Sequence, residues 1–159
     1  MKIIRRFLRQ PQVVYAHCDI PCGIYDPHQA QVAALTVIRM MDLIAESGDA
    51  SGTVPTHNLA RYTAVKDEHA ELCKHEIRVI WGDYIKQEHI DKHPELNETV
   101  HRIMQLGSEA RQGVDREVAL ELLGAVNRFS EMFWETKGVE TKRVKFPYKP
   151  EEEVIYPIF

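Results

Sequence analysis

The chain has 159 residues, of which 44% are hydrophobic and 28% charged, so it is long enough to form one globular domain with a buried core. Its mild formal charge of −4 argues against nucleic acid as the main partner. No apolar run is long enough to cross a membrane, and three cysteines cannot form a complete disulfide framework.

The first sixteen residues, 1–16, are basic and end in Val14-Tyr15-Ala16, whose small last residue suits a processing peptidase. Polar residues from Arg9 onward interrupt the apolar core that a secretory signal needs. Thiols that bind metal must also stay reduced, which favours a reducing compartment. We therefore expect a cytoplasmic protein whose pro-segment is removed by a peptidase.

The stretch HCDIPCGIYD follows and has the features of a compact metal-binding hook. Pro21 fixes φ and Gly23 permits a sharp turn, so the sulfur atoms of Cys18 and Cys22 can approach one point. If the pro-segment is removed, His17 offers both a free amine and an imidazole. The reference pKa of the amine is about 8, so a metal can displace its proton near neutral pH.

The donor set of this hook indicates which metal it binds. The amine, the deprotonated backbone nitrogen of Cys18 and the two thiolates make a planar set, and the His17 imidazole is available as an axial fifth ligand. Planar nitrogen and sulfur ligation suits nickel or copper better than zinc. Electron-rich thiolate and amidate donors favour a redox-active nickel site, although a redox dithiol or adventitious zinc remains an alternative for the cysteine pair.

Four amphipathic segments come after the hook, and the first follows Asp26-Pro27, a pair typical of a helix start. Apolar residues recur at three- and four-residue intervals, and no segment is typical of a core strand. The sequence predicts an all-α fold, an antiparallel four-helix bundle. Its helices are expected at about residues 27–46, 55–84 and 94–110, with a fourth between a cap at Asp115 and a stop at Gly138.

The second helix carries the one cysteine outside the hook. Cys73 is expected to be a buried, unreactive thiol. The inward stripe of this helix is expected to comprise Leu59, Tyr62, Val65, His69, Leu72, Glu76, Ile80 and Trp81.

The last segment, residues 139–159, differs in composition because it holds three prolines and several aromatic residues. Prolines forbid a long helix, and exposed aromatic residues are unfavourable in a free tail. We expect an extended arm laid on a surface, such as that of a neighbouring subunit, or else a partly disordered tail. The predicted layout is a pro-segment (1–16), a hook (17–26), a bundle (27–138) and this arm.

The motif His-Cys-Asp-x-Pro-Cys-Gly-x-Tyr-Asp-Pro resembles the nickel hook of the nickel superoxide dismutase family. Later segments resemble the family in the same order, so the similarity spans roughly residues 17–137. These segments are Lys66-Asp67-Glu68 with Glu71-Leu72, then Trp81 to Lys86, His93 to Leu96, and Phe133 to Lys137.

This resemblance implies an activity and a site. The activity is the conversion of superoxide to dioxygen and hydrogen peroxide through a Ni(II)/Ni(III) cycle, with one nickel ion per subunit. The implied ligands are the thiolates of Cys18 and Cys22, the Cys18 amide, and the amine and imidazole of His17. The family also assembles as a hexamer of bundles.

Four further residues are expected near the metal, each with a simpler alternative. Tyr25 is expected to guard the opening and limit larger anions, or else to pack at the helix start. Tyr84 resembles the family tyrosine that supports this gate, or else packs at a helix end. Asp19 accepts hook N–H groups or is a solvated turn residue, and Lys86 attracts the anion or is simply a solvated lysine.

The sequence departs from the family at two positions. Relatives place a glutamate and an arginine there to orient the axial imidazole, whereas this chain has Ala33 and His69. Our hypothesis is that His69 takes over as the partner of His17; the alternative is a core histidine. Two other function classes remain open, a non-catalytic helical metal-binding module and a thiol-redox protein that uses Cys18 and Cys22.

Overall fold

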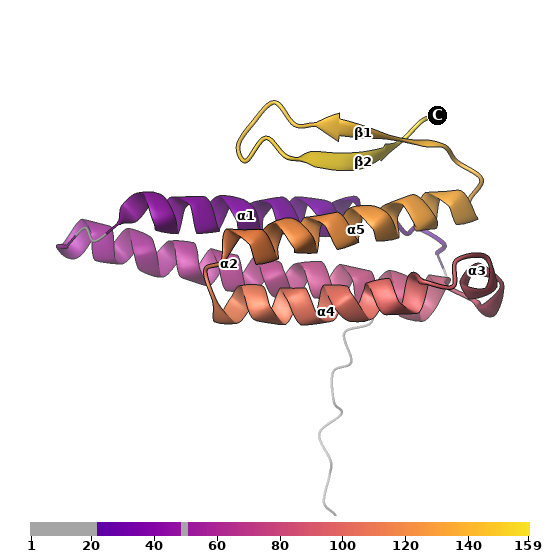
Figure 1. Cartoon of the computed structure of the whole chain (residues 1–159), viewed down its shortest axis with the longest axis horizontal. Helices are drawn as coiled ribbons and strands as arrows, with labels where there is room; N and C mark the ends of the chain where they lie inside the picture. Colours follow the sequence, from indigo (N-terminus) through magenta and orange to yellow (C-terminus); the bar gives the residue numbers. More distant parts are fainter. Residues whose placement is uncertain (1–21, 49–50) are drawn as a thin grey trace, which may run out of the picture.

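The computed structural model describes residues 22–48 and 51–159, and its main body consists of four long helices packed side by side (Figure 1). Helix α1 packs against α2 and α5, and α4 packs against the same two helices, which closes a ring. The chain is therefore mostly helical, as the sequence predicted. The four helices are α1 (His28–Ser47), α2 (Thr53–Val79), α4 (Leu96–Gln112) and α5 (Arg116–Thr136).

Local signals set the ends of these helices. The Asp115 carboxylate accepts a hydrogen bond from the backbone N–H of Glu117 at 2.9 Å, which caps the start of α5. Gly138 follows the end of α5 with φ +69°, a conformation that favours glycine. Both predictions are confirmed. At the start of α1, Asp26 accepts a hydrogen bond from the His28 N–H at 2.8 Å.

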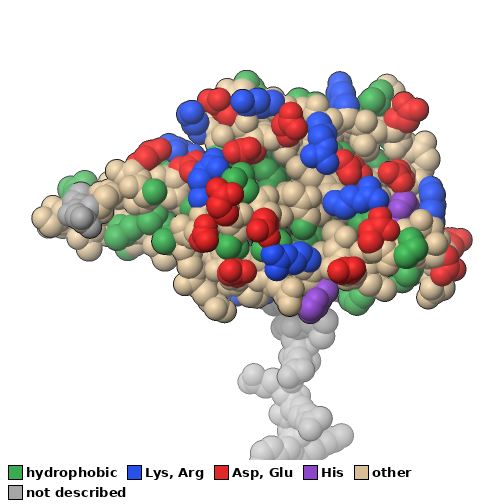
Figure 2. All heavy atoms as spheres, viewed as in Figure 1, with side chains coloured by type: hydrophobic (Ala, Val, Ile, Leu, Met, Phe, Trp, Pro, Cys, Tyr) green, Lys and Arg blue, Asp and Glu red, His purple; other side chains and the backbone are tan. Residues whose placement is uncertain are grey.

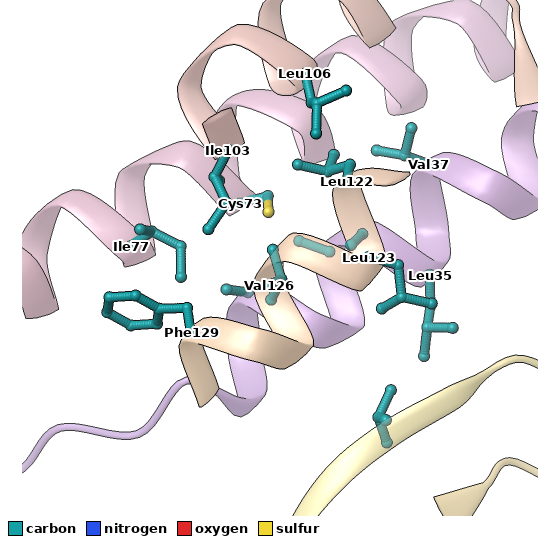
Figure 3. Close-up of a cluster of buried hydrophobic side chains, with 14 of the residues drawn as sticks. Leu35, Val37, Cys73, Ile77, Ile103, Leu106, Leu122, Leu123, Val126 and Phe129 are labelled. Carbon is teal, nitrogen blue, oxygen red and sulfur yellow. The ribbon is translucent and has the colours of Figure 1, made fainter. Parts of the chain in front are cut away.

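The inward faces of the four helices form one apolar core, part of which Figure 3 shows. Cys73 projects into it among Ile103, Leu122 and Val126, and its side chain is fully buried. Burial, with the nearby Glu76 charge, raises the pKa of the Cys73 thiol to about 12. The prediction of a buried thiol is confirmed, and this pKa makes the group unreactive near neutral pH.

The stripe predicted for α2 is wrong in part. Leu59 and Trp81 are 41% and 42% exposed, although they were expected to face inward. The first turns of α2, with the end of α1, extend beyond α4 and α5 (Figure 1), so neither of those two helices covers this part of α2. The residues of α2 that are buried are Lys66, Ala70, Cys73 and Ile77.

The end of α2 is also more complex than predicted. The expected helix to residue 84 is interrupted, because α2 gives way to a π-helical turn, η1 (Ile80–Tyr84). A backbone hydrogen bond of 3.2 Å from Ile85 N to Ile80 O closes this wider turn. A short helix, α3 (Gln87–Lys92), then leads into α4.

The C-terminal segment forms a β-hairpin, so the expectation that no strand contributes to the core is wrong. Strand β1 (Thr141–Lys145) pairs antiparallel with β2 (Glu153–Pro157). Val154 and Ile155 are buried. The prolines had indicated an extended arm, but two of them lie in the connection between the strands, where they do not interrupt strand pairing. The hairpin lies over α1 and α5 of its own chain (Figure 1).

The surface mixes charges of both signs. Figure 2 shows acidic and basic side chains interspersed over the visible face, with hydrophobic side chains at the projecting end formed by α1 and α2. Within residues 22–48 and 51–159, no helix has the length and apolarity needed to cross a membrane.

Candidate metal centre

The described part of the chain begins at one of the predicted metal ligands, Cys22. Its side chain is exposed, and its thiol is free. Gly23, next to this thiol, has φ +71°, the left-handed backbone conformation that favours glycine. An accessible thiol is a soft ligand that suits nickel. The other predicted ligands, His17 and Cys18, and the predicted hook residue Asp19 lie outside the described residues.

The segment that follows Cys22 leads to a pair of tyrosines. Tyr25 is half-buried, and its ring centroid lies 5.6 Å from that of Tyr84, with the ring planes tilted by 40°. Tyr25 comes from the segment before α1 and Tyr84 from the π-helical turn η1. The structure therefore brings together the two tyrosines that sequence analysis assigned to one gate. Tyr25 is three residues after Cys22 along the chain.

The hydroxyl of Tyr84 is held by α5. It lies 2.7 Å from Thr136 Oγ1, and Thr136 Oγ1 in turn donates to the Phe133 carbonyl oxygen at 2.6 Å. Because the Thr136 proton is used in that bond, Tyr84 is the donor to Thr136. The lone pairs of the Tyr84 oxygen therefore remain able to accept a hydrogen bond.

Phe133 packs on the Tyr84 ring with centroids 5.2 Å apart, and two polar side chains also contact this ring. His89 stacks on it, with centroids 5.1 Å apart and an interplanar angle of 20°. The Lys137 ammonium lies 4.2 Å from the ring centroid, within the range of a cation–π interaction. Sequence reasoning gave neither residue a role, although Lys137 ends one of the segments that resemble the family. The tyrosine pair thus has a positive charge beside it.

Lys86 lies at the surface, two residues after Tyr84. Its side chain is exposed, and Nζ donates to the Asp83 carbonyl oxygen at 3.0 Å. Its backbone N–H donates to His89 Nδ1 at 3.1 Å. That bond makes Nδ1 an acceptor, so the proton of the neutral His89 ring is on Nε2. Lys86 therefore orients the ring that stacks on Tyr84.

His69 does not join this cluster. Its ring is half-buried, and Nδ1 lies 2.9 Å from the Val65 carbonyl oxygen on the same helix. It precedes Tyr84 along the α2 axis by about 20 Å, at about 1.5 Å per residue. Ala33, the other position that departs from the family, is buried in the core. In the part of the chain that the structure describes, no three His, Cys, Asp or Glu side chains are grouped to hold a metal.

Comparison with known proteins identifies the family. The model of nickel-containing superoxide dismutases matches residues 12–137, which include the whole hook and all four long helices. The chain belongs to this family. The matched range begins before the described residues and ends directly after α5, so the C-terminal hairpin lies outside the part that the family shares.

Individual relatives support the same assignment. The chain is 35% identical to "Superoxide dismutase [Ni]" of Streptomyces coelicolor over 85% of this chain and 98% of that protein. It is 36% identical to the protein of the same name from Streptomyces seoulensis, over 78% and 90%. A crystal structure of a nickel-containing superoxide dismutase in the oxidised state of its nickel ligation matches with a TM-score of 0.70. That match is 35% identical and covers 77% of this chain and 99% of the other.

Proposed function

We propose that the chain is a nickel-dependent superoxide dismutase, an oxidoreductase that converts superoxide to dioxygen and hydrogen peroxide. Family membership over the hook and all four long helices carries this proposal. The described geometry supports it, because the exposed Cys22 thiol comes three residues before Tyr25, whose ring packs on that of Tyr84.

The proposed ligands of one nickel ion per subunit are Cys22, Cys18 and His17. Cys22 and Cys18 would supply thiolates, the Cys18 amide would supply one nitrogen, and His17 would supply its amine and its imidazole. When bound, nickel supplies one-electron oxidation and reduction of superoxide through its Ni(II) and Ni(III) states. The left-handed backbone at Gly23 supports this proposal, because it would allow the chain to change direction beside Cys22.

The residues around the tyrosine pair control access in this proposal. Tyr25 and Tyr84 narrow the approach so that a small anion passes and larger anions are hindered. Lys137 places a positive charge over the Tyr84 ring and attracts superoxide. Lys86 contributes less to attracting the anion than Lys137 does in this proposal. Its backbone N–H orients His89, and its ammonium donates to the Asp83 carbonyl oxygen. Asp19 is proposed to accept N–H groups within the hook.

His69 remains the proposed partner of the His17 imidazole. Its separation of about 20 Å from Tyr84 along α2 makes the hook of a neighbouring subunit the natural place for such a contact. The proposal therefore requires an oligomer, and we propose a homohexamer like that of the family. Nickel binding and turnover unchanged by His69→Ala would contradict the proposed contact.

The proposed mature protein begins at His17. A peptidase removes residues 1–16 in the cytoplasm and exposes the amine that binds nickel. The proposed layout is the hook at residues 17–26, a four-helix bundle at 27–138 and a C-terminal arm at 139–159, of which the hairpin is the folded part.

The experiment that tests the function separates three outcomes. Purified protein is analysed for its N-terminal residue, its metal content and its cysteine oxidation. Nickel together with an N-terminal His17 supports the proposed enzyme. Zinc with residues 1–16 retained indicates a metal-binding module instead, and a stable Cys18–Cys22 disulfide indicates a thiol-redox protein.

A further inference from the structure

The C-terminal hairpin is integrated into the core, although it lies beyond residue 137, where the family match ends. Val154 and Ile155 of β2 are 0% and 2% exposed. Such burial requires that the hairpin be fixed on the helices beneath it. We therefore asked what its contacts with α1 and α5 do.

One contact joins β2 to the first turn of α1. The side chain of Gln31 is buried, and its carboxamide pairs with both backbone groups of one residue. Gln31 Nε2 donates to the Ile155 carbonyl oxygen at 3.2 Å, and Gln31 Oε1 accepts from the Ile155 N–H at 2.7 Å. The amide thus takes the place of a neighbouring strand at the edge of β2. Removing it would leave two buried backbone groups unpaired.

A second contact lies at the first residue of α1. The ring of Tyr156 is 5.4 Å from the ring of His28, and the ring of Phe146 is 6.5 Å from it in an edge-on arrangement. His28 is three residues after Tyr25 and six after Cys22. The hairpin therefore packs on the point where the segment carrying the thiol enters the helix.

The other end of β2 is attached to α5. Asn127 Nδ2 donates to the Glu153 carbonyl oxygen at 2.8 Å. Arg116 joins Glu152 of the hairpin to Asp42 of α1, with contacts of 3.0 and 2.8 Å. The hairpin is consequently fixed at both ends, once on α5 and once on the start of α1.

From these contacts we infer that the hairpin is a brace for the root of the hook, holding the segment Cys22–His28 in a defined position on the bundle. A ligand that is already ordered loses less conformational freedom when a metal binds. The brace should therefore slow nickel release. This last consequence rests on the proposed function, whereas the ordering of residues 22–28 does not.

The test compares two tyrosines of the same hairpin in the full chain. Tyr156→Ala removes the ring that packs on His28. Tyr148→Ala is the matched control, because Tyr148 stacks on Phe146 with centroids 4.7 Å apart and is 51% exposed. Hydrogen exchange in the metal-free protein should become about two- to tenfold faster in residues 22–31 of Tyr156→Ala, the range expected for loss of one aromatic pair. Tyr148→Ala should accelerate this exchange less than Tyr156→Ala does, because Tyr148 reaches His28 only through Phe146.

A second variant and a second readout keep the test decisive. Gln31→Met keeps the length of the side chain but loses both bonds to Ile155, so it should also accelerate exchange in residues 22–31. After loading with nickel, both variants should release the ion to a chelator faster than the parent does. Exchange in α4 serves as the internal control and should not change.

Two results would overturn the brace. One is exchange in residues 22–31 that stays at the parental rate in both Tyr156→Ala and Gln31→Met. The other is acceleration of equal size in α4, which would mean general unfolding. A parent chain that takes up no nickel would contradict the proposed function, and the exchange data would still decide whether the brace exists.

Discussion

Tyr84 donates its hydroxyl proton to Thr136 while its ring packs on Tyr25, so a residue of α5 fixes the ring that we propose borders the approach to Cys22. The pairing joins the segment before α1, the π-helical turn and the end of α5. If the proposed gate is correct, access to the metal centre depends on how these three elements pack as well as on the hook.

The Tyr84 hydroxyl gives the first prediction. Tyr84→Phe keeps the ring against Tyr25 and His89 but loses the bond to Thr136, so the ring is less firmly placed. Nickel content should stay at the parental level, and kcat/KM for superoxide should fall by about two- to tenfold, as expected for one hydrogen bond. Steady-state kinetics of nickel-loaded protein measures this.

Thr136→Val is the matched control for the hydroxyl. It removes the acceptor and leaves the Tyr84 hydroxyl intact. A loss similar to that of Tyr84→Phe would show that the bond itself matters. Full activity in both variants would contradict the role assigned to Thr136.

Lys137 gives the second prediction, which concerns attraction of the anionic substrate. Lys137→Gln should lower kcat/KM for superoxide and flatten its dependence on ionic strength, because salt screens the charge that attracts the anion. Lys86→Gln should have the smaller effect, since the Lys86 ammonium is bound to Asp83 O on the exposed surface. An equal or larger effect of Lys86→Gln on kcat/KM would contradict the proposal that Lys137 is the main charge attracting superoxide.

The two described cysteines give the third prediction. Alkylation of the folded, metal-free protein at neutral pH should modify Cys22, which is exposed, and spare Cys73, whose pKa is raised to about 12 by burial. Peptide mass mapping before and after denaturation measures both sites. Rapid modification of Cys73 in the folded protein would contradict its placement in the core.

Glu71 gives the fourth prediction, which concerns pH. A hydrogen bond from Arg78, helped by the charges of Lys74 and Arg111, holds the Glu71 pKa below its usual 4.5. The ionised carboxylate therefore stabilises the folded state above about pH 4.5, and this stabilisation is lost as the pH falls through the lowered pKa. Because the carboxylate is 41% exposed, the loss in Glu71→Gln should be at most about 1 kcal/mol at pH 7.

Denaturant unfolding of the parent and Glu71→Gln at pH 7 and at pH 3 measures this difference. The gap in unfolding free energy should be present at pH 7 and should have narrowed at pH 3. A gap that widens toward low pH would contradict the sign of the effect.

The long helices were predictable because periodicity and caps agree locally. Asp115 and Gly138 mark the ends of α5 in both sequence and structure. Trp81 was expected on the inward stripe of a continuous α-helix, but it lies in the π-helical turn η1, where the α-helical spacing of that stripe no longer holds. The hairpin was not predicted because β2 is stabilised by a contact that is distant in sequence. Its partner, Gln31, lies more than a hundred residues earlier.

Site residues within one short motif could be predicted from the sequence. Residues whose positions depend on how separate helices pack could not. Cys22, Gly23 and Tyr25 follow from the hook sequence, and Tyr84 was found through the family resemblance. The positions of Lys137 and His89 around the Tyr84 ring depend on how α5 and α3 meet η1, which spacing alone does not reveal. For the same reason, the distance of His69 from the tyrosine pair was not anticipated.

The central claim is tested most directly by the rate of superoxide loss in protein that begins at His17 and has been loaded with nickel. The account predicts one nickel ion per chain and rapid catalytic loss of superoxide. Cys22→Ser should abolish both, and Cys73→Ser should retain them. Nickel-loaded protein of this form that fails to accelerate superoxide loss would contradict the account.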